Sequence, residues 1–128
     1  MEEICRIDID KYACAVPGVI RSELLILTEN QKEHIIKRRG QEFYDMYSPC
    51  FPEIAKDPDY IFADGIHENT VLASKTVLSG GKNVHLVIRL ALTDDAEGLE
   101  NSIITAIIES DKRYKQRLRN SVPLYKKG

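Results

Sequence analysis

The chain has 128 residues, of which 43% are apolar and 30% charged, and its formal net charge at pH 7 is −2. This length suits one domain with a single hydrophobic core. The sequence has no apolar run near the ~18 residues that a membrane-spanning helix needs, and its N-terminus, MEEICRIDID, lacks the pattern of a signal peptide. We therefore expect one globular domain over residues 1–128, located in the cytoplasm and without a membrane partner.

Metal and disulfide sites have no support in the sequence. The three cysteines, Cys5, Cys14 and Cys50, show no C-x-x-C spacing, which argues against a zinc site and a disulfide framework. Asp94 and Asp95 lack the regular oxygen-ligand spacing of a calcium loop. There is no glycine-rich phosphate loop, so no metal and no cofactor are expected.

Basic residues gather at the C-terminal end. Between Asp111 and Gly128, seven Lys or Arg residues stand against one acid. Such asymmetry is typical of a surface that binds phosphate. The alternative is a solvated helix face followed by a basic tail.

The N-terminal part predicts two strands and a helix. Residues 4–10 alternate between apolar and polar, as in a half-buried strand. Residues 24–27 are all apolar and predict a buried strand. Thr28 and Gln31 then form a capping box that starts a helix, and Gly40 is suited to end it.

The later elements favour an α+β fold. A turn at Ser79-Gly80-Gly81 predicts a β-hairpin between two longer strands. We expect N-terminal helices packed on one side of a curved, mainly antiparallel sheet of about four to five strands. The expected elements are helical segments at 41–47 and 52–56, strands from 60, at 69–78, 82–92 and 102–108, a helix at 111–120 and an edge strand at 123–127.

The helix after Thr28 carries the residues most suited to chemistry. His34 and Arg38 are four positions apart and share one face, while Ile35 is directed toward the core. Histidine can donate or accept a proton near neutrality, since its ordinary pKa is about 6.5. Arginine binds phosphate oxygens through its planar guanidinium. The alternative is that both are ordinary residues of an exposed helix face.

Three polar residues interrupt otherwise apolar strands, namely Lys75, Arg89 and Thr105. Each also has a structural explanation. Lys75 can extend to solvent from a sheet edge, Arg89 can pair with an acid, and Thr105 suits a strand because it is β-branched. His67 and His85 show no comparable pattern.

The chain carries, in order, HIIKRR (34–39), DPDYI (57–61), Lys75, Arg89, NSIIT (101–105) and LYKK (124–127). Together these motifs resemble a known family, the phage-associated nuclease domains of the barnase–EndoU–colicin–RelE superfamily. The resemblance begins near Ile20 and covers nearly the whole chain. It implies a small, metal-independent endoribonuclease with a helical N-terminal part, a four-stranded curved antiparallel sheet and RNA (tRNA or mRNA) as substrate. An antitoxin or immunity protein is a candidate partner.

The resemblance also suggests roles for individual residues. It implies proton transfer by His34, phosphate stabilisation by Arg38 and Lys75, and a positioning hydroxyl on Thr105. The expected RNA-binding residues are Arg39, Arg89, Arg113, Tyr125 and Lys126.

Arg39 departs from the family pattern, because relatives commonly have a histidine there. This departure favours an alternative function, a catalytically weakened module of the same fold that binds RNA or a protein. A structural partner in a mobile-element complex is a third option. The sequence leaves the oligomeric state open.

Overall fold

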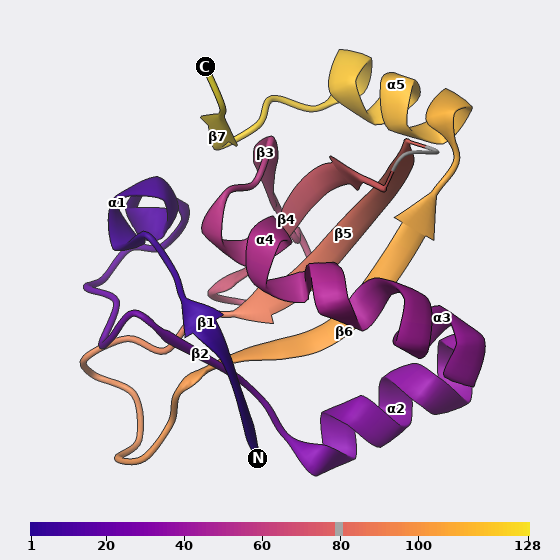
Figure 1. Ribbon diagram of the computed structural model, residues 1–128. Coiled ribbons are helices and arrows are strands. Elements are labelled where there is room, and N and C mark those ends of the chain that lie inside the picture. Colours follow the sequence, from indigo (N-terminus) through magenta and orange to yellow (C-terminus); the bar gives the residue numbers. More distant parts are fainter. Residues whose placement is uncertain (79–80) are drawn as a thin grey trace.

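The computed structural model describes residues 1–78 and 81–128 and contains one seven-stranded sheet (Figure 1). The strands are β1 (Glu2–Arg6), β2 (Leu24–Leu27), β3 (Tyr60–Ala63), β4 (Thr70–Val77), β5 (Lys82–Arg89), β6 (Asn101–Glu109) and β7 (Tyr125–Lys126). Their order across the sheet is β1-β2-β6-β5-β4-β3-β7. The β2–β6 pair is parallel and the other pairs are antiparallel.

The helices begin and end where local sequence signals place them. They are α1 (Ile9–Tyr12), α2 (Glu29–Arg39), α3 (Gln41–Tyr47), α4 (Phe51–Lys56) and α5 (Asp111–Asn120). The predicted cap of α2 is confirmed, because Thr28 Oγ1 accepts a hydrogen bond from the Gln31 N–H at 3.2 Å. Gly40 follows α2 with φ of 100°, a conformation that glycine adopts without a Cβ penalty. No described helix has the length and apolar character needed to cross a membrane.

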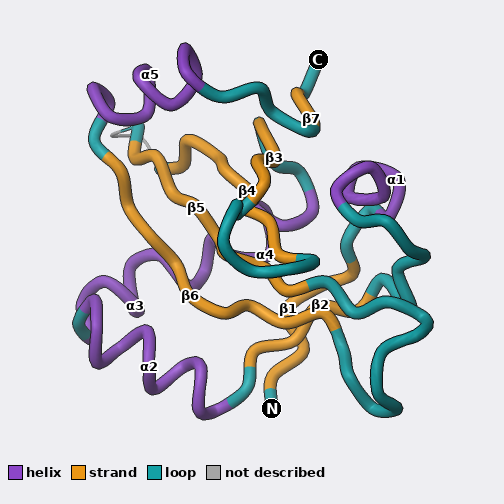
Figure 2. Tube along the Cα trace, turned by 180° about the vertical axis from the view of Figure 1, so that it is seen from behind, coloured by secondary structure: helices purple, strands orange, loops and turns teal. Residues whose placement is uncertain are grey.

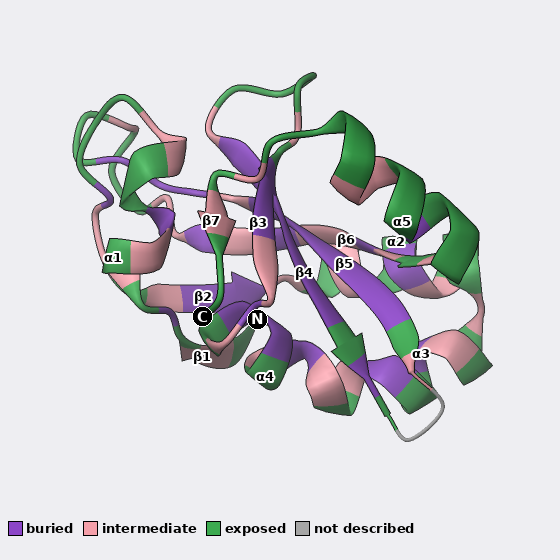
Figure 3. Ribbon diagram, turned by 90° about the horizontal axis from the view of Figure 1, so that it is seen from above, coloured by how far each residue is buried: buried purple, intermediate pink, exposed green. Residues whose placement is uncertain are grey.

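Two apolar clusters cover the two faces of the sheet. The main core joins α2, α3 and α4 to one face, where Ile35, Ile54 and Ile88 are fully buried. A smaller cluster on the other face joins Phe62 and Val87 to Tyr114 of α5. In Figure 3 the central strands are largely buried, whereas the outer face of α5 is exposed.

The α+β class is confirmed, but the sheet has more strands than expected. Helices also pack on both of its faces and not on one side alone. Seven strands replace the predicted four to five, and α5 packs on the face opposite α2 and α4. The expected number was too low because β1 and β7, which the sequence also predicts as strands, pair into the same sheet at its two edges. Tyr114 and Leu118 give α5 an apolar side of its own.

The expected strand at 4–10 ends at Arg6, because the Asp8 carboxylate caps α1 by accepting the Asp10 N–H at 3.1 Å. The predicted hairpin strands pair antiparallel, with Val77 opposite Lys82. Residues 79–80 of its turn lie outside the described residues.

β2 pairs with β6 only at Asn101 and Ser102, at the start of β6. Helix α2 lies alongside the part of β6 beyond this pairing (Figure 2). Farther along β6, the Arg39 Nε–H donates to the Ala106 carbonyl at 3.1 Å. Ile35 of α2 thus packs in the main core on one face of the sheet, while other side chains of α2 reach the face that α5 covers.

Candidate functional site

A concavity of about 920 Å³ lies on the α5 face of the sheet, beside α2. Its walls come from α2, from the loop between β3 and β4, and from residues of β4, β5 and β6. It combines three guanidinium groups with two carboxylates and two imidazoles. The lining residues that matter for chemistry are His34, Arg38, Arg39, Asp64, His67 and Thr105.

The α2 wall presents free polar groups. His34 and Arg38 are exposed, and neither makes a hydrogen bond or ion pair with the rest of the described chain. Arg39 also lines the concavity, but its Nε is committed to the β6 backbone. His34 and Arg38 are therefore available to a ligand, and Arg39 holds the helix in place.

The strands line the cavity with the apolar Val87, Ile104 and Ile107 and with the polar Thr70, Arg89 and Thr105. Val87 on β5 lies opposite Thr105 on β6. The register shifts there, since Ile88 pairs with Ile103 and Ile104 becomes an extra residue. Such β-bulges re-aim side chains and occur often beside active sites. Here the bulge places Ile104 next to Thr105 on the cavity floor.

The loop between β3 and β4 adds a histidine for which the sequence showed no pattern. Asp64 Oδ2 accepts hydrogen bonds from the N–H groups of Ile66 at 3.3 Å and His67 at 2.8 Å. The same oxygen lies 3.0 Å from His67 Nδ1. Burial alone would raise the pKa of Asp64, but these bonds from His67 and Ile66 hold it below its ordinary value. The Asp-x-x-His spacing is a signal that could have been noticed.

Arg89 stands at the edge of the cavity but is already paired. Its guanidinium contacts both oxygens of Asp95, at 3.2 Å and 3.3 Å, and also donates to the Leu90 carbonyl. The bond from Arg89 is the main reason that the pKa of Asp95 is lowered. This arrangement matches the acid pairing left open by the sequence, so Arg89 has less charge to offer a ligand.

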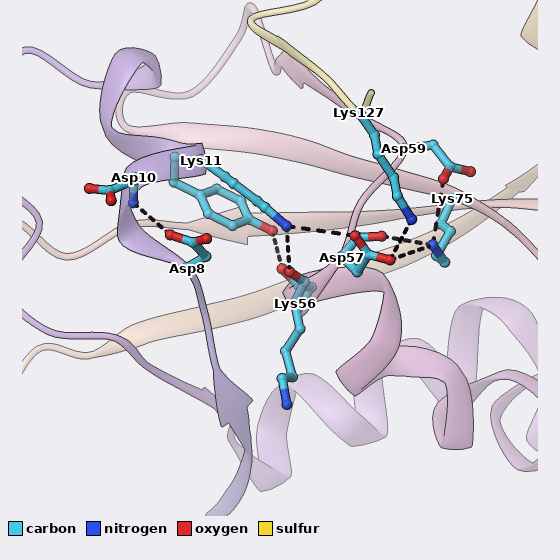
Figure 4. Close-up of polar contacts among 10 residues, drawn as sticks. Asp8, Asp10, Lys11, Lys56, Asp57, Asp59, Lys75 and Lys127 are labelled. Carbon is cyan, nitrogen blue, oxygen red and sulfur yellow. Dashed lines mark hydrogen bonds and ion pairs between the residues drawn. The ribbon is translucent and has the colours of Figure 1, made fainter.

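Lys75 lies away from the cavity, on the main-core face of the sheet. Its Nζ donates to the Asp57 carbonyl at 2.8 Å and lies 3.3 Å and 3.5 Å from the carboxylates of Asp57 and Asp59 (Figure 4). Its side chain is only 10% exposed. The resemblance implied that Lys75 acts together with His34 and Arg38, but the structure places Lys75 apart from both.

The remaining predicted RNA-binding residues are also outside the cavity lining. Tyr125 packs against the main core, with the Lys11 ammonium 5.8 Å from its ring centroid. Lys126 is exposed on edge strand β7. Arg113 is exposed on α5, which lies on the same face of the sheet as the cavity.

A buried polar chain runs beside the smaller core. Ser74 Oγ is hydrogen-bonded to His85 Nδ1, and His85 Nε2 lies 2.9 Å from Glu109 Oε1. Burial is the main cause that lowers the pKa of His85. Arg117 donates to both Glu109 oxygens at 3.1 Å and 2.9 Å. Chiefly through these bonds, the pKa of Glu109 falls to about 2.

Comparison with protein-family models, with curated proteins and with solved structures finds no match for this chain.

Proposed function

We propose that this protein is a metal-independent endoribonuclease that binds and cleaves an RNA phosphodiester in the cavity beside α2. The observation that carries the proposal is the meeting of His34 and Arg38 with Thr105 around one concavity. These residues come from a helix and a strand some seventy positions apart in the sequence. They supply an imidazole, a guanidinium and a hydroxyl to the same space.

Such groups match the requirements of RNA cleavage. A base removes the 2′-OH proton, and the 2′-oxygen attacks phosphorus while the bond from phosphorus to the 5′-oxygen breaks. An acid then protonates the leaving oxygen, which gives a 2′,3′-cyclic phosphate and a 5′-hydroxyl. Cations and hydrogen-bond donors stabilise the charge that develops on the phosphoryl oxygens.

We assign proton transfer to His34 and phosphate binding to Arg38. The guanidinium of Arg38 stays charged and can hold two phosphate oxygens at once. Thr105 would orient the phosphate from the floor. Val87 and Ile104 beside it offer an apolar surface against which a nucleobase can pack.

The neighbouring helix supports a polymeric substrate. Val87 and Ile107 line the cavity and also belong to the apolar cluster under α5. A strand that leaves the cavity along this face would meet the exposed cations of α5. These are Lys112, Arg113, Lys115 and Arg119.

The test is cleavage of total tRNA and mRNA by the purified protein in EDTA. We expect His34→Ala to lower the rate at least about a hundredfold, the usual contribution of a proton-transfer group. Lys37→Ala is the matched control, since Lys37 is exposed on α2 and is not part of the cavity lining. Equal cleavage by wild type and His34→Ala would contradict the assignment.

The alternative is a module that binds RNA or a protein without cutting. Arg39, in place of the family histidine, favours it. Absence of cleavage together with a salt-dependent RNA complex would support this alternative. Arg39→His is then the variant with which to seek activity.

A further inference from the structure

We infer that His67, held by Asp64, is a second proton-transfer residue of the cavity and serves as the general acid for the leaving 5′-oxygen. The inference rests on the proposed ribonuclease function. It concerns a residue outside every motif that suggested that function. It also offers a replacement for the histidine that the family pattern places at Arg39.

His67 has a fixed hydrogen-bond partner, unlike an ordinary exposed histidine. Its side chain is 73% exposed, whereas the carboxylate that it contacts is only 13% exposed. Asp64 is held by two backbone N–H groups as well as by the ring. A carboxylate fixed in this way orients the imidazole through Nδ1–H, and Nε2 of this cavity-lining residue has no hydrogen-bond partner among the described residues.

The charged neighbours suggest how the two histidines divide the work. The Asp64 carboxylate gives His67 a fixed partner 3.0 Å from Nδ1, which suits the ring to deliver a proton from Nε2. His34 has no hydrogen-bond partner within the described residues and lies on α2 beside Arg38, the residue assigned to the phosphate. We assign His34 as the base that takes the 2′-OH proton. The charged and titratable groups that line the cavity around His67 are His34, Arg38, Arg39, Asp64, Glu68 and Arg89.

The proton balance is complete with these two residues. His34 receives the proton of the 2′-OH as the P–O2′ bond forms. His67 gives its Nε2 proton to the 5′-oxygen as the P–O5′ bond breaks. Water and buffer then return both rings to their starting forms.

A leaving group that needs no proton separates the two roles. We would compare a short RNA with uridine 3′-(4-nitrophenyl phosphate), whose nitrophenolate departs unaided. His67→Ala should lower RNA cleavage about a hundredfold and leave release of nitrophenolate within about threefold of wild type. His34→Ala should impair both substrates, because each needs the base. Turnover of the activated substrate also reports that the His67→Ala cavity is folded.

Asp64→Asn tests the positioning role. Removing the carboxylate should lower RNA cleavage and leave release of nitrophenolate close to wild type, a difference between substrates that a purely structural defect would not produce. Equal rates of Asp64→Asn and wild type on RNA would overturn this part of the inference.

The outcomes distinguish the two proposals. If wild type cleaves neither substrate, the ribonuclease function itself fails. If wild type cleaves RNA and His67→Ala cleaves it equally fast, only the assignment of His67 fails. Equal losses of His67→Ala on both substrates would also exclude a general-acid role.

Discussion

Asp57 carries a carboxylate that three lysines from distant parts of the chain share. Lys11 approaches it at 3.6 Å, Lys75 at 3.3 Å and Lys127 at 2.6 Å (Figure 4). The hydrogen bond from Lys127 is the main cause that lowers the pKa of Asp57 to about 2. These contacts join α1, β4 and the C-terminal end around one side chain, which indicates a structural role for Lys75.

Replacing Lys75 should therefore affect stability and leave the chemistry of the folded protein unchanged. Lys75→Met removes hydrogen bonds from an ammonium to a carbonyl and two carboxylates. We expect a loss of roughly 1–3 kcal/mol in the free energy of unfolding, measured by urea denaturation. RNA cleavage per folded molecule should equal that of wild type.

Lys126→Met is the matched control, because Lys126 is exposed and makes no side-chain hydrogen bond or ion pair within the described residues. Its unfolding free energy should stay within about 0.5 kcal/mol of wild type. A Lys75→Met protein that is fully stable but slow to cleave RNA would restore the role in phosphate binding that the family resemblance implied.

At the scale of elements, the chain of Ser74, His85, Glu109 and Arg117 ties β4, β5, β6 and α5 together. The neutral His85 ring accepts at Nδ1 and donates to Glu109 through Nε2–H. This arrangement depends on pH. In the folded state, His85 stays neutral at pH values just below 6.5, the ordinary pKa of histidine. In the unfolded chain, the same side chain binds a proton at these pH values.

The free energy of unfolding should consequently fall as the pH drops below about 6.5. The fall should be at most about 1.4 kcal/mol per pH unit between the ordinary pKa of histidine and the lowered pKa of His85 in the folded state. The lowered pKa of Glu109 adds a second loss as the pH falls from 4.5 toward about 2. Urea unfolding between about pH 7 and pH 5 isolates the first effect, since the ordinary pKa values of the carboxyl groups lie lower.

His85→Asn should flatten this dependence, whereas His34→Asn, which removes an exposed imidazole without a hydrogen bond or ion pair among the described residues, should keep it. A wild-type protein equally stable at both ends of the range would show that protonation of His85 is not coupled to folding.

At the scale of the whole molecule, charge is segregated in space as well as in sequence. The chain is slightly acidic, with a net charge of −2. The basic segment nevertheless forms α5, which packs over the sheet face that holds the cavity. This placement would offer the RNA proposed as substrate one favourable face on a protein whose net charge otherwise disfavours polyanions.

Neutralising one cation of α5 should weaken RNA binding and its dependence on salt. For Arg113→Gln we expect a higher Kd and a salt slope shallower by about 1, the value for one lost phosphate contact. Lys56→Gln is the matched control, because Lys56 is an exposed residue of α4, which packs on the opposite face. Binding measured across a salt series checks both variants, and identical slopes would place RNA elsewhere.

Sequence by itself determined the elements with strong local signals. Thr28 capped α2 and Gly40 ended it as expected, and residues 111–120 became a helix with the predicted bounds. Apolar runs gave the buried strands β2, β4, β5 and β6. Local hydrogen bonds and side-chain periodicity act over a few residues, so these features were open to prediction.

The tertiary structure decided which residues meet. Lys75 and Thr105 both interrupt apolar strands, but the alternation of side chains puts them on opposite faces of the sheet. His67 reaches the cavity because the loop after β3 folds around Asp64, a contact that no periodicity indicates. α2 brings His34 to Thr105 because β2 ends early and leaves space beside β6. Such proximity depends on register, strand order and helix docking, which are set by long-range packing.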